Sequence, residues 1–154
     1  MDISMILRPG AVRVIGAISS KKRLIHELGD VAHAVYGIDA QAAIEALQER
    51  ESLGPTGVGY GVALPHARLV DIDRVVGVLI VLETPINFDA VDRLPVDIAF
   101  ALFAPKEAGV EHLKALALVS RTLRDAQLCA KLRANPDSVT LYSIVTEAHA
   151  MLAA

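Results

Sequence analysis

The sequence predicts an α/β protein in which a β-sheet is covered by helices on both faces. Two nearly unbroken aliphatic runs, Val75–Leu82 and Val96–Phe103, indicate strands that are buried on both sides. Segments with apolar residues at helical spacing precede and follow these runs. Because 53% of the 154 residues are hydrophobic and only 4% are aromatic, we expect an aliphatic core within a single domain, 1–154.

Composition excludes several classes of function. A net charge of -3 provides no basic surface for nucleic acid or for an anionic membrane, so neither is expected as a partner. The single cysteine, Cys129, cannot form an internal disulfide, and a reduced cytoplasmic setting is expected. We find no signal-peptide pattern at the amino terminus and no apolar segment long enough to span a membrane.

The first third of the chain predicts a short apolar opening, a strand and two helices. The opening covers residues 3–9 and the strand residues 12–18. Ser20 is a good N-cap for the first helix, which Gly37 ends, and Asp39 can cap the second. Three histidines of the chain are interpreted as surface or structural residues without a functional role: His26, His33 and His149.

The second half predicts connections and helices around the two buried strands. Residues 68–73 are polar enough to form a connection, and residues 83–95 have the proline, Asn and Asp content of a turn-rich loop. Apolar spacing predicts a helix over residues 113–123, a short helix that starts at Asp125, and a final helix over residues 141–152.

The chain is organised around residues 56–66, where glycines alternate with other residues at positions Gly57, Gly59 and Gly61. If this backbone is extended, the missing side chains leave one face bare for a ligand or for a partner's main chain. Pro65 stiffens the end of the run and gives His66 a defined direction. The alternative is a glycine-rich loop that ends in a buried histidine, and whether residues 60–63 pair as a strand stays open.

His112 is the second candidate histidine. It lies at the head of the apolar stripe formed by Leu116, Val119 and Leu123, so its ring should point towards the sheet. Such a histidine can be a satisfied half-buried residue. It becomes a site candidate because helix starts and glycine-rich turns gather at the same end of an α/β sheet, near His66.

Two chemistries suit a pair of imidazoles. A zinc site needs three or four ligands, and the chain lacks closely spaced ligand motifs, so no metal is expected. A neutral imidazole can instead accept a transferable phosphoryl group, for which His112, backbone N–H groups near His66 and Arg50 could donate hydrogen bonds. The chain has no Walker lysine motif, which argues against a nucleotide as the phosphate source.

These residues resemble a known family, the IIA components of the bacterial phosphoenolpyruvate phosphotransferase system, in its mannitol/fructose branch. The resemblance extends from about residue 3 to about residue 150. It rests on the following residues: Thr56-Gly57, Gly59, Gly61, Pro65-His66, Glu83-Thr84-Pro85-Ile86, Phe88-Asp89, Pro95-Val96-Asp97, Phe100, Pro105 and His112-Leu113.

The resemblance implies a mixed sheet flanked by helices and a phosphotransferase activity without a cofactor. His66 would accept a phosphoryl group from the phosphohistidine of HPr or an HPr paralogue, and His112 and Arg50 would support that group. Contacts with the partner or the phosphate would come from the remaining motif residues: Thr56, Gly57, Gly59, Gly61, Pro65 and Arg68.

The length and the opening residues are most similar to the nitrogen-regulatory members of the family, whose phosphorylation state regulates other proteins. A sugar-specific IIA subunit with a separate IIB partner, and a non-catalytic binding module, stay open as alternatives. Many members have Gly-Lys after the active histidine, whereas this chain has Ala67-Arg68. The positive charge is kept and the backbone is less free, which bears on how the donor docks.

Overall fold

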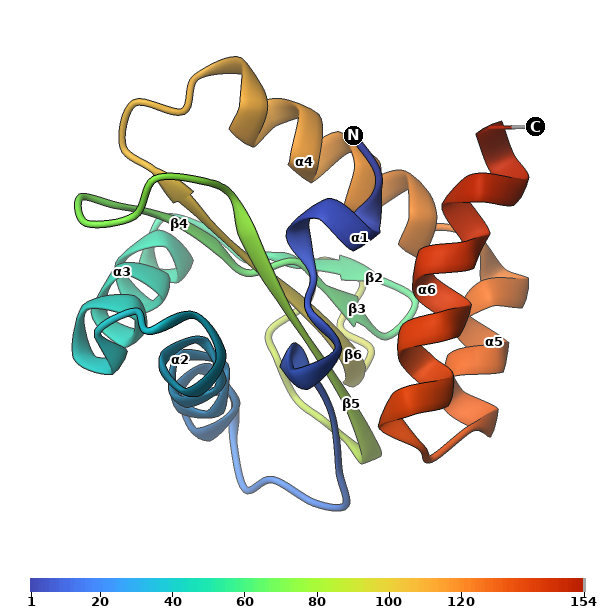
Figure 1. Ribbon diagram of the computed structural model, residues 1–154. Coiled ribbons are helices and arrows are strands. Elements are labelled where there is room, and N and C mark those ends of the chain that lie inside the picture. Colours follow the sequence, from blue (N-terminus) through green and yellow to red (C-terminus); the bar gives the residue numbers. More distant parts are fainter. Residues whose placement is uncertain (154) are drawn as a thin grey trace.

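The protein is an α/β structure in which a mixed sheet lies between two layers of helices (Figure 1). This computed structural model describes the backbone of residues 1–153 and the side chains of residues 1–147. Helices α2 (Lys21–Tyr36) and α3 (Ala40–Ser52) cover one face of the sheet, and α4 (Val110–Leu123), α5 (Ala126–Ala134) and α6 (Ser138–Ala153) cover the other. The predicted fold class is confirmed, and so is the mixed sheet implied by the resemblance.

The sheet has six strands: β1 (Val12–Ile15), β2 (Gly57–Gly59), β3 (Val62–Ala63), β4 (His66–Leu69), β5 (Val76–Ile86) and β6 (Val96–Pro105). The long strands β5 and β6 pair antiparallel in its centre, and β1 lies parallel to β5. Within the predicted apolar runs almost every residue of β5 and β6 is buried, whereas Glu83, Thr84 and Pro85 of β5 are exposed.

Two short strands share the other edge of β6. Both β3 and β4 run parallel to β6, with Val62 opposite Ile98 and His66 opposite Leu102. The two residues between them are also held, since Leu64 N donates to the Thr56 carbonyl at 2.9 Å and Leu102 N donates to the Pro65 carbonyl at 2.9 Å. The backbone just before His66 is therefore held by hydrogen bonds to Thr56 on one side and to β6 on the other.

The capping predictions are confirmed at four positions. The side chains of Ser20, Asp39 and Asp125 accept hydrogen bonds from the first-turn N–H groups of α2, α3 and α5. Gly37 ends α2 in the left-handed conformation, with φ of 73°. Glu111 lies in the first turn of α4, which begins three residues before the predicted helix.

Three predicted boundaries are wrong. Residues 66–69 form β4, although residues 68–73 were expected to be a connection. Strand β5 continues to Ile86 into the predicted loop, and the first strand, β1, ends at Ile15. In each case pairing with a neighbour decides the length. The strand β4 is a short segment that contains the polar residues His66 and Arg68, and its register with β6 supports it, which local composition does not reveal.

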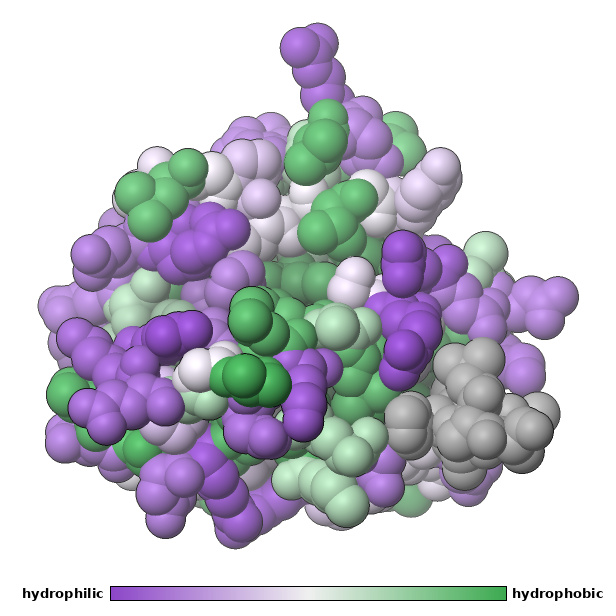
Figure 2. Space-filling view, turned by 90° about the horizontal axis from the view of Figure 1, so that it is seen from above, coloured by the Kyte–Doolittle hydropathy of each residue, from purple (hydrophilic) through white to green (hydrophobic). Residues whose placement is uncertain are grey.

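The amino-terminal segment and α4 lie at the top of the molecule in Figure 1, and α6 runs along its right side. The amino-terminal segment consists of α1 (Ile3–Ile6) and a 3₁₀ turn, η1 (Pro9–Ala11). In the view from above, apolar side chains gather near the middle of this face and hydrophilic ones lie on either side (Figure 2). Exposed apolar residues of α1 and α4 are Met5, Val110 and Leu113.

The remaining predictions concern the cysteine, two histidines outside the candidate site and the absence of a membrane-spanning segment. Cys129 is buried in α5, and His33 is exposed with its Nδ1 2.9 Å from the Ile38 carbonyl. The side chain of His149 lies outside the described residues. Among the helices that the structure describes, none combines the length and the apolar character needed to cross a bilayer.

Candidate active site

His66 begins β4 with a ring that is held by its own chain. Its Nδ1 lies 3.0 Å from the carbonyl oxygen of Leu64, two residues earlier. A carbonyl only accepts, so in the neutral ring Nδ1 carries the proton and donates it. The Nε2 atom then keeps its lone pair, and this is the nitrogen with which a neutral His66 can act as a nucleophile.

His112 lies in the first turn of α4 and is buried, with 5% of its surface exposed. The Nε of Arg68 donates a hydrogen bond of 3.2 Å to its Nδ1. Within the described part of the chain, the buried Nε2 of His112 has no hydrogen-bond partner. Leaving such a group unpaired costs about 1–3 kcal/mol, so a buried nitrogen of this kind marks a place where a ligand atom would be stabilised.

The structure brings the two histidines together, as the sequence predicts. Their ring centroids are 5.6 Å apart and the rings meet edge to face at 65°. Burial lowers the pKa of both rings, and the pKa of His112 falls to about 4, with contributions from the charges of His66 and Arg68. Both imidazoles are therefore neutral near pH 7, which is the state that a nucleophile and a neutral hydrogen-bond donor require.

Arg50 lies in the last turn of α3, the helix that packs against β4. Its Nη1 donates a 3.0 Å hydrogen bond to the Gly54 carbonyl, which holds the half-buried side chain at the end of the helix. The positive charge of Arg50 contributes to the lowered pKa of His66, after burial. The charge of Arg50 therefore acts on the His66 ring. Helix α3 contributes Arg50 to the surroundings of this ring, and α4 contributes His112.

Thr56 is buried beneath the hairpin and does not lie on the surface of the protein. It is 4% exposed, and both its backbone N–H and its hydroxyl donate to the carboxylate of Glu51, at 2.7 Å and 2.6 Å for the shortest contacts. Lys21 lies 3.3 Å from the same carboxylate. The Thr56 hydroxyl is thus already bonded within the protein, and its predicted contact with phosphate or partner stays a prediction.

The expected bare glycine face is not formed, and this is a correction. Residues 57–63 make a tight hairpin in place of one extended run, because β2 turns back on β3 through Tyr60 and Gly61, with φ of 55° and 81°. A side chain at Gly57 would come within 2.8 Å of Ala90, and one at Gly61 within 2.5 Å of Arg133. At these two positions the absence of a side chain makes room for the protein's own residues.

The hairpin is clamped from α5, which sequence reasoning did not anticipate. Arg133 binds the carboxylate of Asp97 through Nε at 2.9 Å and the Tyr60 carbonyl through Nη2 at 2.8 Å. At the other side of the turn, Asp92 accepts from the backbone N–H of Tyr60 at 2.9 Å. Asp97 is the only charge in an otherwise apolar strand, and that isolation is the signal that could have indicated a partner.

Three further predicted residues lie in β2, in the link from β3 to β4 and in β4: Gly59, Pro65 and Arg68. Gly59 has a φ of 108° and faces Asp92, while Pro65 connects β3 to β4. Arg68 lies two residues after His66 and reaches across to α4, where it contacts His112. The role of these three residues in binding a partner or phosphate stays a prediction.

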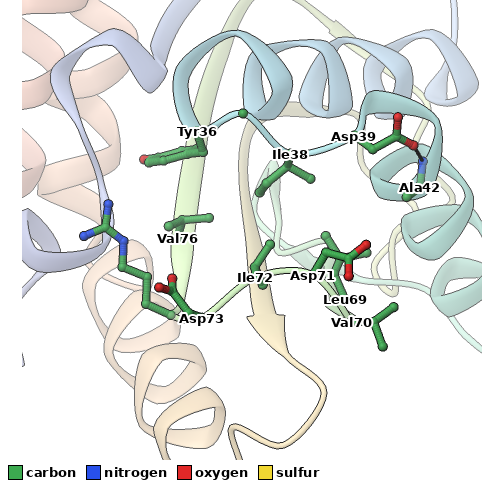
Figure 3. A pocket seen from close by; sticks show the side chains of 12 residues that line it. Tyr36, Ile38, Asp39, Ala42, Leu69, Val70, Asp71, Ile72, Asp73 and Val76 are labelled. Atoms are coloured by element: carbon green, nitrogen blue, oxygen red, sulfur yellow. Dashed lines mark hydrogen bonds between the residues drawn. The ribbon is translucent and has the colours of Figure 1, made fainter.

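A separate cavity of about 340 Å³ lies at the far end of β4 (Figure 3). None of the residues that line it belongs to the histidine site. Two of its polar side chains have partners within the protein: Asp39 accepts from the Ala42 N–H, and the Tyr36 hydroxyl donates to the Gly77 carbonyl. Over the described residues, no cluster of three or more His, Cys, Asp or Glu side chains is arranged to hold a metal ion.

The fold and the paired imidazoles define a class of protein: an α/β structure that presents one half-buried histidine on a strand paired with β6, beside a second, buried histidine. Comparison with known proteins identifies its family. Residues 5–148 match the phosphoenolpyruvate-dependent sugar phosphotransferase system EIIA 2 family. The chain belongs to this family, and the resemblance described from the sequence is confirmed.

Individual relatives agree with this assignment. The chain is 41% identical to the nitrogen regulatory protein of Bradyrhizobium diazoefficiens over 94% of this chain and 95% of that one. It is 30% identical to the fructose-specific EIIA component of Haloferax volcanii, over 95% and 96% of the two chains. Among solved structures, the nitrogen regulatory protein IIA-Ntr of Neisseria meningitidis matches with a TM-score of 0.85 at 32% identity, covering 94% of this chain and 99% of that one.

Proposed function

We propose that this chain is a phosphocarrier that accepts a phosphoryl group on Nε2 of His66 from the phosphohistidine of an HPr-type protein. Its phosphorylation state would then regulate partner proteins, as the nitrogen-regulatory relatives suggest by name. The observation that carries the proposal is the arrangement of the two rings. His66 has its Nδ1 fixed by the Leu64 carbonyl, and a buried, unpartnered Nε2 of His112 belongs to a ring 5.6 Å away.

The proposed step needs no metal and no nucleotide. The lone pair on Nε2 of His66 forms the new N–P bond while the donor's N–P bond breaks, and the electron pair of that bond stays on the donor imidazole. The Nδ1 proton of His66 remains on its bond to Leu64 throughout. Phosphoryl transfer depends on in-line positioning and on donors for the equatorial oxygens, which His112 and Arg50 would supply.

The surroundings offer an apolar surface for a partner. A hollow of about 810 Å³ is lined by residues of the hairpin, by Leu94 and by Leu64, whose carbonyl holds His66. Val58 and Tyr60 on the hairpin are 50% and 86% exposed. Exposed apolar side chains beside a polar centre are typical of a protein-docking surface, which supports a protein as the phosphoryl donor.

The experiment that tests the proposal is intact-mass measurement after incubation with phosphoenolpyruvate, enzyme I and an HPr-type carrier. We expect an acid-labile gain of one phosphoryl group in the wild type and none in His66→Ala. Because the ring of His66 is half-buried at a strand start, circular dichroism should show that His66→Ala still folds. His26→Ala, which alters a histidine of α2, serves as the matched control and should be phosphorylated normally.

Two results would contradict the proposal. Phosphorylation of His66→Ala at another residue would show that His66 is not the acceptor. Failure of the wild type to gain mass with an active donor system would favour a binding module that signals by association alone.

A second candidate is a sugar-specific IIA subunit, which the similarity to a fructose-specific EIIA component favours. In that case the phosphoryl group would pass from His66 to a cysteine of a separate IIB protein. Transfer of the label from the phosphorylated wild type to a purified IIB domain separates this role from the regulatory one.

A further inference from the structure

Arg68 connects three segments that surround the histidine pair. It extends from β4, two residues after His66, and its Nε donates to Nδ1 of His112 in α4 at 3.2 Å. Its Nη1 donates at 3.2 Å to the carbonyl of Lys106, in the turn between β6 and α4. One guanidinium therefore ties the strand that carries His66 to the helix start that carries His112.

The direction of the Arg68–His112 hydrogen bond fixes the proton of His112. A guanidinium has only donors, so Nδ1 of His112 must accept and cannot carry a proton itself. A neutral imidazole has one N–H, which therefore lies on Nε2. This is the buried nitrogen for which the described residues provide no partner. In this tautomer Nε2 of His112 is a hydrogen-bond donor, whereas in the other tautomer the same atom would carry a lone pair.

We propose that Arg68 is a positioning residue that holds His112 in the Nε2–H tautomer, so that its buried N–H can donate to the phosphoryl group on His66. The inference rests on the proposed function. It gives Arg68 a positioning role, whereas the sequence predicted direct contact of this residue with the partner or the phosphate. A phosphoryl oxygen is an anionic acceptor, so an N–H stabilises it and a lone pair repels it.

Arg68 is suited to this task by geometry and exposure. Its side chain reaches the buried ring from an exposed position on β4, so the guanidinium can stay hydrated while its Nε contacts His112. The planar guanidinium presents Nε and Nη1 in fixed relative directions, which match the ring nitrogen and the Lys106 carbonyl at once. Arg50, by contrast, donates to the Gly54 carbonyl and, within the described part of the chain, makes no hydrogen bond to His112 that could set its tautomer.

The experiment compares Arg68→Met, which removes the donor, with Arg68→Lys, which keeps one. Arg121→Met is the matched control: it removes an exposed arginine from α4, nine residues after His112 and so on the opposite side of the helix. Long-range ¹H–¹⁵N spectra of the unphosphorylated proteins report the tautomer of each histidine. We expect the Nε2–H form at His112 in the wild type, Arg68→Lys and Arg121→Met, and a mixture of both tautomers in Arg68→Met.

The second measurement is the rate of phosphoryl uptake from an HPr-type carrier and the lifetime of the phosphohistidine. Loss of one neutral hydrogen bond in the transfer step should slow uptake about fivefold in Arg68→Met. Arg68→Lys should recover most of the rate, and Arg121→Met should match the wild type. If Arg68 positions His112, the rate and the tautomer change together in Arg68→Met. A general structural defect would slow uptake but leave the tautomer of the folded protein unchanged.

The outcomes that overturn the inference differ from those that overturn the proposed function. A wild-type His112 with its proton on Nδ1, or an Arg68→Met variant with wild-type tautomer and rate, contradicts the role of Arg68 while His66 phosphorylation stands. A wild type that takes up no phosphoryl group contradicts both, and the spectra of the same sample show whether the tautomer was nevertheless as expected.

Discussion

At the scale of single residues, the candidate site depends on two imidazoles that are kept neutral by burial. His112 is the more extreme, with a pKa of about 4 against an ordinary value of 6.5. His66 is half-buried, and its pKa is lowered by burial and by Arg50 while the Leu64 carbonyl and Glu51 raise it. The pKa of the ring that would accept the phosphoryl group is thus lowered against opposing contributions, whereas the pKa of the ring that would donate to that group is lowered much further.

The low pKa of His112 predicts a pH dependence of stability. Its folded pKa is below its unfolded value, so the unfolded chain binds more protons between about pH 4 and 6.5. The contribution of His112 is therefore fully present above pH 6.5 and is lost as the pH falls towards 4, by up to roughly 3 kcal/mol. Urea unfolding at several pH values should show this loss in the wild type and a smaller one in His112→Gln. Parallel pH curves for the two proteins would contradict it.

At the scale of elements, the hairpin β2–β3 and the strand β4 form one supported unit that ends at His66. The hairpin is closed by Asp92 on one side and Arg133 on the other, and the link from Leu64 to Pro65 is bonded at both ends. The first strand of the hairpin can lie close to the loop after β5 only because Gly57 has no side chain. The direction of His66 therefore depends on close backbone packing several residues earlier.

Gly57→Ala tests this packing. The added methyl would lie 2.8 Å from Cα and Cβ of Ala90, so the hairpin or the loop must move. We expect a loss of about 1–3 kcal/mol in the free energy of unfolding, measured by urea denaturation. Gly10→Ala is the control, because its methyl would meet only Val35 at an ordinary 3.7 Å, and we expect a change within about 0.5 kcal/mol. Equal stability of the two variants would show that the close approach is not tight.

At the scale of the whole molecule, one cluster of charges joins parts of the chain that are distant in sequence. Lys21 at the start of α2 lies 3.3 Å from Glu51 at the end of α3 and 3.6 Å from Asp89, and its Nζ is 4.7 Å from the centre of the Phe88 ring. The Glu51 carboxylate in turn holds Thr56 before the hairpin. This cluster fixes the helical layer that carries Arg50 against the loop and the hairpin.

Glu51→Gln is expected to weaken this cluster. The side chain of Glu51 is 7% exposed, so replacing its charge leaves Lys21 and Thr56 poorly paired and should cost about 1–3 kcal/mol in unfolding free energy. It should also lower the pKa of His66 further, since Glu51 raises it, and NMR titration of the ring would show the direction. Glu27→Gln breaks the exposed pair with Arg23 and should change stability by less than about 0.5 kcal/mol. A similar small change in both variants would contradict the structural role of the cluster.

Much of this arrangement could be predicted from local patterns. Ser20, Gly37, Asp39 and Asp125 end or begin helices through side-chain and backbone effects that act within a few residues. The buried strands β5 and β6 follow from continuous apolar runs, and His112 from its place at the head of an apolar stripe. His66 was indicated as a candidate by its place after Pro65, and the resemblance added the family and the phosphoryl donor; the family match confirms the family.

Short-range chemistry and motif spacing along the chain were sufficient to predict helices α2 to α6 with four of their caps, the two central strands and the family, whereas α1 was expected only as part of an apolar opening. Three features came to light in the folded chain alone: residues 66–69 pair with β6, the glycines fold into a hairpin clamped by Arg133, and Arg68 contacts His112. Each of these depends on groups far apart in sequence, and their partners are chosen by register and packing. For that reason the alternating glycines predicted an open face, while the folded chain uses them for close contacts with itself.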